Sequence, residues 1–367
     1  MEQQKEHSGC VDGLPDDLCQ LREGFATGAC AAAAAKASIL ALLDTLVSPS
    51  SVEIPFPSGE RFSFSVEWIK RHEGYVESAV RKDAGDDPDI TQGVLVVARV
   101  AWRVGEDILF EAGEGVGRVT KSGLSIPPGE PAINPGPRNM IRAGIREVTD
   151  RGVSVTISIP GGEELAKKTF NPRLGIVGGL SVLGTTGRVR PFSCQAIRCS
   201  VACELDVAKA AGITHPVLVP GHIGERSARR HLNLKEDQLI EVGNEWGFVL
   251  EGLSKYTFEH VLLWGHPGKL AKLADEEWDT HSSRSASAVE IVKRLGLMPK
   301  IEPEPVTMEG LFEMLKPEEQ QKLAAELGEA ISRAASQKCG QCCRISVGLV
   351  NMIGELLGSY KSLEDFQ

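Results

Sequence analysis

The sequence of 367 residues lacks any run of about 18 consecutive apolar residues, the length that a membrane-spanning helix requires. Its polar opening, MEQQKEHSGC, lacks the basic and then apolar pattern of a secretion signal. Positive charge is not in excess either: the formal net charge is -10, whereas a general nucleic-acid binder needs a basic surface to replace phosphate counterions. We therefore expect a cytoplasmic protein with neither a nucleic acid nor a membrane as its partner.

A disulfide framework is also missing, because the nine cysteines show no recognisable pairing pattern in a chain of this length. Three of them, Cys339, Cys342 and Cys343, cluster near the end without a standard ligand spacing. A soft metal or an iron–sulfur cluster would need a further cysteine from the segment 194–203. The alternative is a set of reduced cytosolic thiols around a final helix, and no metal ligand is predicted.

Composition and periodicity indicate two cores, since 42% of the residues are hydrophobic and the chain exceeds the size of one small domain. Residues 1–20 are predicted to form a flexible leader. Residues 21–190 are predicted to form an α+β domain, because an alanine-rich helix over 27–46 precedes several alternating segments. Strands are predicted at 52–54, 62–66, 93–104, 108–111 and 153–159, and a second helix at 138–149.

The pattern changes after about residue 190, where short apolar runs end in glycine and lead into helices. Examples are 217–221 and 261–265. Such units build parallel sheets, so residues 191–300 are predicted to form an α/β domain, Rossmann-like with a mostly parallel sheet. Residues 301–367 are predicted to be a helical segment. Because open α/β sheets bind ligands at the carboxyl ends of strands, Gly221 and His266 are expected at the rim of a site.

Glycine and proline are dense in residues 113–138, which predicts a rigid loop. Four basic residues accompany this loop: Arg118, Lys121, Arg138 and Arg142. Gathered on one surface, they could hold the carboxylates of an acidic ligand, with arginine forks making bidentate contacts. The alternative is a solvated basic edge of a hairpin.

A second glycine run covers residues 175–187 and does not match the G-x-G-x-x-G fingerprint. Its exposed amides could face an adenosyl group or a carboxylate. The alternative is an ordinary turn at a sheet edge. The candidate cofactor-binding residues are Gly175, Gly178, Gly179, Gly184, Thr185 and Thr186 from this run, together with Gly221.

Two further segments contain candidates for proton transfer. The acidic loop 82–91 lacks the ligand order of a calcium loop, but crowded carboxylates raise one another's pKa, so Asp86 or Asp87 could accept a proton. The alternative is a solvated turn in which aspartates cap backbone amides. His266 and His281 sit in loops where either could shuttle a proton or bind a carboxylate, although a capped or surface histidine is the alternative for each.

Taken in order, several segments resemble the CbiD family of cobalt-precorrin-5B C(1)-methyltransferases. No single short motif decides the resemblance, which extends over residues 21–300. The segments are 21–33, 83–91, 113–138, 171–187, 265–274 and 280–282. The sequence departs from the family pattern at 222–223, at 244–246 and after Ser282.

The resemblance implies S-adenosylmethionine as methyl donor and a tetrapyrrole substrate that already carries cobalt, methylated at C-1 in corrin biosynthesis. It makes Asp86, Asp87 and His266 the catalytic candidates. The four basic residues of the first loop, with Lys269 and His281, become the candidates that hold the cobalt-precorrin. The alternatives are a non-catalytic tetrapyrrole or cobalt carrier and a small-molecule phosphotransferase; a homodimer is left open.

Overall fold

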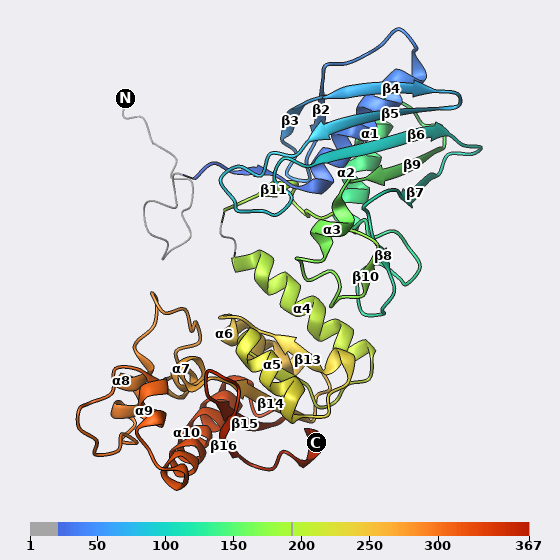
Figure 1. Cartoon of the computed structure of the whole chain (residues 1–367). Coiled ribbons are helices and arrows are strands. Elements are labelled where there is room, and N and C mark those ends of the chain that lie inside the picture. The colour runs from blue at the N-terminus through green and yellow to red at the C-terminus, as the bar shows by residue number, and fades with distance from the viewer. Residues whose placement is uncertain (1–20, 192–193, 367) are drawn as a thin grey trace, which may run out of the picture. The chain divides into compact units, whose positions relative to one another are not determined.

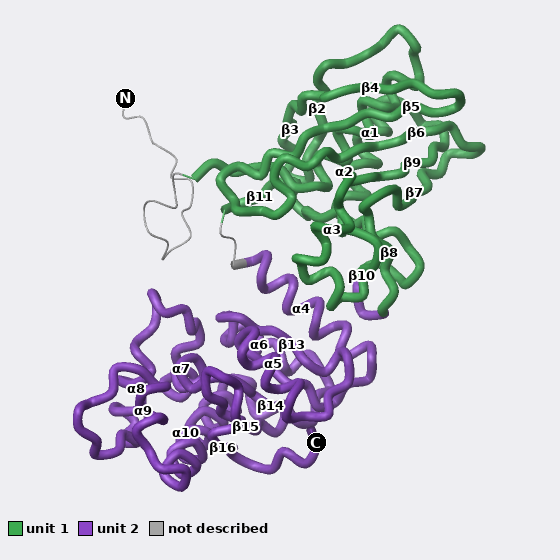
Figure 2. The backbone as a smooth tube through the Cα atoms, in the orientation of Figure 1, with its two compact units in different colours: residues 1–121, 125–194 green, residues 122–124, 195–367 purple. Residues whose placement is uncertain are grey.

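The computed structural model describes residues 21–191 and 194–366, so the predicted leader lies outside the described residues (Figure 1). The chain divides into two compact units (Figure 2): unit 1 comprises residues 1–121 and 125–194, and unit 2 comprises residues 122–124 and 195–367. Each unit combines helices with a sheet that contains both parallel and antiparallel strand pairs, so the architecture is mixed α/β. Within the described residues, no helix is both long and apolar enough to cross a membrane.

Unit 1 is built on a five-stranded sheet in the order β4-β5-β6-β9-β7, antiparallel except for the parallel pair of β7 and β9. The strands are β4 (Trp68–His72), β5 (Tyr75–Arg81), β6 (Leu95–Trp102), β7 (Ile108–Ala112) and β9 (Val153–Ser158). The strands predicted at 52–54 and 62–66 are present as β2 (Ser51–Pro55) and β3 (Arg61–Ser65), which pair antiparallel. Short pairs join β1 (Gly24–Phe25) to β11 (Arg188–Val189) and β8 (Arg118–Val119) to β10 (Ile176–Val177).

Helix α1 (Thr27–Leu43) forms the centre of unit 1 and confirms the predicted alanine-rich helix. Its five consecutive alanines, Ala31 to Ala35, are fully buried, and such small side chains let the helix lie close to β5, β6 and α2 (Pro135–Arg146). Two buried hydroxyls tie the helix to the sheet: Ser38 donates to the Ala98 carbonyl at 2.8 Å, and Ser78 donates to the Ala34 carbonyl at 2.6 Å. A short helix, α3 (Gly162–Ala166), follows β9.

Unit 2 contains a sheet in the order β13-β12-β14-β15-β16, in which the first four strands are parallel and β16 is antiparallel. Both faces are covered: Leu218 and Leu263 face one apolar core, while Val219 and Trp264 face another. The strands are β12 (Val217–Val219), β13 (Leu239–Glu241), β14 (His260–Gly265), β15 (Arg344–Val350) and β16 (Leu356–Tyr360). The helices are α4 (Cys194–Ala210), α5 (His222–His231), α6 (Trp246–Gly252), α7 (Pro267–Leu270), α8 (Ala288–Arg294), α9 (Met308–Glu313) and α10 (Pro317–Lys338), with 3-10 turns at Glu236–Gln238, Leu253–Lys255, Ala271–Asp275 and Glu364–Phe366.

The last segment differs from the helical prediction for residues 301–367. Helix α10 is present as expected, but β15 and β16 follow it and complete the sheet. Six of the seven residues of β15 are buried, from Ile345 to Val350. A strand buried on both faces shows no alternation, so its sequence cannot be told from a buried helix by periodicity.

The amino end of β15 carries a Ser–His–Asp chain of hydrogen bonds. His260 Nε2 lies 2.7 Å from Ser346 Oγ, and its Nδ1 lies 2.6 Å from Asp365 Oδ2. Ser346 is fully buried in β15, so its hydroxyl is closed to a substrate and the chain is not a nucleophilic triad. It ties the C-terminal turn around Asp365 to the sheet.

This tie predicts a pH dependence of stability. Burial lowers the pKa of His260, aided by Arg344 and His215, and the hydrogen bond to Asp365 opposes the shift only in part. The unfolded chain therefore binds the proton more readily, and stability is lost as the pH falls below about 6.5, the ordinary histidine pKa. Urea unfolding between about pH 5 and 8 should show this loss in the native chain and a smaller one in His260→Gln. Equal slopes in both proteins would contradict the assignment.

Candidate functional site

The carboxyl ends of β12, β13 and β14 form one edge of the unit 2 sheet, which we call the carboxyl edge. Strand β12 lies between the other two, so the chain passes from β12 to β13 on one side and then to β14 on the other. Ligands of open α/β sheets bind where the strand order reverses in this way. At the reversal, a Cβ on Gly265 would lie 2.7 Å from Pro220 Cδ, so only glycine allows β12 and β14 to end this close together.

A glycine turn and an acidic side chain meet at this edge. Gly221 has φ 150° and ψ -166°, a conformation that is open essentially to glycine alone, and α5 begins at the next residue. The Glu241 carboxylate oxygen Oε1 lies 3.6 Å from where a Gly221 Cβ would be. Glu241 ends β13, and its backbone N–H donates to Glu204 Oε2 at 3.2 Å.

The order of these features matches a known binding pattern: a strand, a glycine turn, a helix, a second strand and then an acidic residue about 20 positions after the turn. In such sites the helix N-terminus faces the ligand and the carboxylate accepts hydrogen bonds from ribose hydroxyls. Gly221 was expected at this rim from the sequence, whereas Glu241 was not. The available signal was an acidic residue that closes a short apolar run, Leu239-Ile240.

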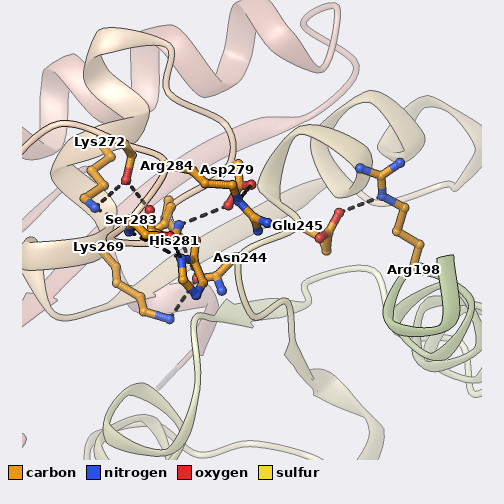
Figure 3. Close-up of polar contacts among 11 residues, drawn as sticks. Arg198, Asn244, Glu245, Lys269, Lys272, Asp279, His281, Ser283 and Arg284 are labelled. Atoms are coloured by element: carbon orange, nitrogen blue, oxygen red, sulfur yellow. Dashed lines mark hydrogen bonds and ion pairs between the residues drawn. The ribbon is translucent and has the colours of Figure 1, made fainter. Parts of the chain in front are cut away.

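A polar cluster (Figure 3) connects Lys269 in α7, after β14, with Asn244, after β13. Lys269 Nζ donates to Asn244 Oδ1 at 3.0 Å, and Thr280 Oγ1 donates to the same oxygen at 3.1 Å. Lys269 is half-buried, and desolvation, with the charge of Lys272 nearby, lowers the pKa of its ammonium group. The ammonium has three N–H donors, and Asn244 holds it in place through one of them.

His281, another predicted substrate contact, is exposed in the turn next to Thr280. Its backbone N–H donates to Asp279 Oδ1 at 3.0 Å, and its Nδ1 lies 2.8 Å from Ser283 Oγ. Asp279 also pairs with Arg284 at 2.7 Å (Figure 3). The structure thus brings Lys269 and His281 to one edge, with Asn244 and Thr280 as the connection.

His266 follows β14 as expected, but both of its ring nitrogens are used. Gly268 N–H donates to Nδ1 at 3.0 Å, so the ring caps α7. Nε2 lies 2.9 Å from Glu309 Oε2, and Glu309 also accepts from the Met352 N–H at 3.1 Å. With Nδ1 accepting, the ring proton sits on Nε2 and points to Glu309, which favours a positioning role over proton abstraction.

The acidic loop of unit 1 is held by basic partners. Arg22 makes a bidentate pair with Asp83, at 2.6 and 2.9 Å, and this pairing lowers the pKa of Asp83 to about 2. Lys82, almost fully buried, pairs with Asp89 at 2.6 Å. The expected upward shift of crowded carboxylates is therefore wrong for Asp83, because its guanidinium partner outweighs neighbouring negative charge. Asp86 is exposed and accepts from the Arg22 backbone N–H at 2.6 Å.

Asp87, the other aspartate predicted to accept a proton, is half-buried in the same turn, and its N–H bonds the Ala84 carbonyl at 3.4 Å. The loop thus has the capped geometry that the sequence analysis gave as an alternative.

The two glycine runs of unit 1 pack directly on each other. A Cβ on Gly179 would lie 2.3 Å from the Gly115 carbonyl carbon, and a Cβ on Gly175 would lie 2.3 Å from Lys121 Cγ. A Cβ on Gly184 would lie 2.3 Å from Ala26 Cβ. Gly179 is therefore required by close backbone packing, whatever ligand approaches. Gly175 and Gly184 meet side chains and have positive φ, a conformation that favours glycine. The other predicted members of the run, Gly178, Thr185 and Thr186, are exposed.

The basic residues around the first glycine run differ in their roles. Arg138 donates to the carbonyls of Ile133 at 2.8 Å and Pro131 at 3.1 Å. These hydrogen bonds hold the end of the 113–138 loop in place. Arg142 is exposed, lies over the Phe110 ring and has its pKa lowered by partial burial and by Arg138. Arg118 is also exposed and donates to Gly129, whereas Lys121 donates to the Arg173 carbonyl at 3.3 Å.

Arg138→Ala is expected to lower the free energy of unfolding by about 2 kcal/mol, because two half-buried carbonyls lose a charged donor. Arg142→Ala is the matched control on the same helix, with an expected loss under about 0.5 kcal/mol. Urea unfolding monitored by circular dichroism measures both values. Equal losses would show that Arg138 does not brace the loop.

The strand order defines unit 2 as an α/β unit with a mostly parallel sheet. Comparison with known proteins identifies the family. The family model described as CbiD matches residues 15–191. A cobalt-precorrin-5B C(1)-methyltransferase from Syntrophotalea carbinolica is 50% identical over 95% of this chain and 100% of the relative, and one from Methanocaldococcus jannaschii is 40% identical over 92% and 96%.

This chain belongs to the CbiD family of cobalt-precorrin-5B C(1)-methyltransferases. The match to the Syntrophotalea protein extends beyond the residues 21–300 that the sequence motifs cover. Among solved structures, a cobalamin biosynthesis protein (cbiD) from Archaeoglobus fulgidus matches 75% of this chain and 85% of its own, with 27% identity and a TM-score of 0.39.

Proposed function

We propose that this chain transfers a methyl group from S-adenosylmethionine to C-1 of cobalt-precorrin-5B in cobalamin biosynthesis. The observation that carries this proposal is the 50% identity, over the full length of the relative, to a protein named for that reaction. At this identity the whole chain, and not one unit of it, corresponds to the relative.

The donor is proposed to bind at the carboxyl edge of unit 2, a Rossmann-like domain in this account. The Gly221 turn lets the ligand approach the backbone at the start of α5, and Glu241 accepts hydrogen bonds from the ribose hydroxyls. A carboxylate at this place also suits the positive charge of a sulfonium donor. Because that charge disappears during transfer, such an attraction stabilises the bound donor more than the transition state.

The chemistry makes few demands on protein side chains. The donor supplies an electrophilic methyl group, and displacement in line at that carbon needs no covalent protein nucleophile. The protein aligns the ring carbon of the macrocycle with the methyl group and keeps water away. His266 orients the start of α7, and Asp86 and Asp87 remain the proposed proton acceptors.

The acidic arms of the macrocycle need cationic partners. Lys269 is the leading candidate, because Asn244 holds its ammonium group in a half-buried position at the carboxyl edge. His281 lies in the neighbouring turn and is exposed. On unit 1, Arg118 and Arg142 are exposed and stay candidates for carboxylate binding, whereas Arg138 serves the loop itself.

The test is incubation of the purified chain with cobalt-precorrin-5B and S-adenosylmethionine labelled in the methyl group. We expect mass analysis of the corrinoid to show one added labelled methyl, located at C-1 by magnetic resonance. Omission of the donor, or Lys269→Ala at low substrate concentration, should reduce the product. Recovery of unmodified substrate from a folded chain with both reactants present would overturn the proposal.

A further inference from the structure

Three thiols converge in unit 2 away from the proposed donor site. Cys339 caps the end of α10 and is 3% exposed, Cys343 is half-buried, and Cys342 is exposed. The three Sγ atoms all lie within 4.8 Å of one another, and those of Cys342 and Cys343 are 3.9 Å apart. No other group of three cysteines in the described residues comes this close.

The turn after α10 creates this convergence. Gly340 and Gln341 both adopt left-handed backbone conformations, with φ 67° and 57°, and the Gln341 N–H bonds back to the Ser336 carbonyl at 2.8 Å. The chain therefore reverses within two residues and brings the next two cysteines back to Cys339. Gln341 is one of few non-glycine residues here with positive φ, a conformation that costs a side chain some strain.

We propose that Cys339, Cys342 and Cys343 bind a thiophilic d10 cation, Zn²⁺, through three thiolates, with water as the fourth ligand. In a tetrahedral site with zinc–sulfur bonds of about 2.3 Å, neighbouring sulfur atoms are about 3.8 Å apart. The pair at 3.9 Å already meets this spacing. The remaining pairs, at 4.8 Å or less, need a shift of about 1 Å, within the reach of side-chain rotation.

The surroundings favour a cation held by thiolates. The last carbonyls of α10 carry the negative end of the helix dipole, which attracts a positive ion. Thiolates are the form in which cysteines bind zinc, so binding would release the thiol protons to solvent. A disulfide, the alternative to a metal site, would use only two of the three sulfur atoms.

The position in the fold assigns the ion a structural role. The cluster joins the end of α10 to the start of β15, and β15 begins beside His260, at the start of β14. This is the opposite edge of the sheet from Glu241 and Lys269. The ion should therefore stabilise unit 2 and leave the affinity for S-adenosylmethionine unchanged, so failure of this inference and failure of the proposed function can be told apart.

The test uses the full chain, reduced and freed of metal, titrated with Cd²⁺ while sulfur-to-metal charge-transfer absorption is recorded. We expect saturation at one cadmium per chain at this site, reversal by a chelator, and, for the chain freed of cadmium, a rise in Tm of about 5 °C with excess Zn²⁺. Cys342→Ser removes an exposed ligand and should weaken binding at least about 100-fold, more than the loss of an outer-shell partner costs. Cys199→Ser, exposed and outside the cluster, is the control and should match the native chain.

Two results would overturn the inference. One is an absorption titration that is the same in Cys342→Ser as in the native chain. The other is a reduced chain that binds no cadmium. If thiol counting after exposure to air then shows a disulfide between two of the three cysteines, the cluster is a redox pair.

Discussion

Replacing Glu241 with glutamine is expected to weaken the binding of S-adenosylmethionine about 30-fold. The amide keeps the size of the side chain but removes the charge that accepts hydrogen bonds from ribose hydroxyls, a contact worth about 2 kcal/mol. Calorimetric titration of the donor into the folded chain measures the change. The observation behind this expectation is that the Glu241 carboxylate lies over the Gly221 turn at the switch in strand order.

Glu259→Gln is the matched control, since it makes the same change in the same unit just before β14, at the opposite edge of the sheet. Donor affinity should be unchanged in this variant. If Glu241→Gln binds the donor within two-fold of the native chain, the ribose contact is not made by Glu241 and the donor lies elsewhere.

Replacing Gly179 with alanine is expected to lower the free energy of unfolding by about 3 kcal/mol, the largest stability effect that we predict. The added methyl would lie 2.3 Å from the backbone of Gly115, and a backbone neighbour cannot rotate away as a flexible side chain can. The two glycine runs would separate, and with them the short pairing of β8 and β10. Urea unfolding monitored by circular dichroism gives the value.

Gly144→Ala provides the comparison within unit 1. Gly144 lies in the last turn of α2, and a Cβ there would meet nothing closer than 3.6 Å. Alanine is the better helix former, so this variant should be as stable as the native chain or slightly more stable. Similar losses in Gly144→Ala and Gly179→Ala would show that the close approach of the two runs is not what requires glycine.

Sequence reasoning predicted the carboxyl edge because its signals are local. The run Val217-Leu218-Val219 followed by proline and glycine specifies a buried strand and a sharp turn, and the run that ends at Gly265 does the same. Two such units in succession indicate parallel strands whose carboxyl ends meet. Gly221 and His266 were therefore predicted at the rim without knowledge of the fold.

Features that depend on distant partners could not be predicted in this way. His266 contacts Glu309, which is 43 residues away along the chain, and no local sequence pattern indicates that contact. Asp83 has a lowered pKa because Arg22, 61 residues earlier, folds back onto it. The glycines at 175, 179 and 184 suggested a ligand, whereas their partners are other parts of the backbone of unit 1 and the side chains of Lys121 and Ala26.

The most direct test of the account is photochemical attachment of labelled S-adenosylmethionine to the native chain, followed by peptide mapping. If the donor binds at the carboxyl edge of unit 2, the label should lie within residues 217–245, around the Gly221 turn and Glu241. Excess unlabelled donor should suppress it. Label confined to residues 175–187, the second glycine run of unit 1, would contradict the account.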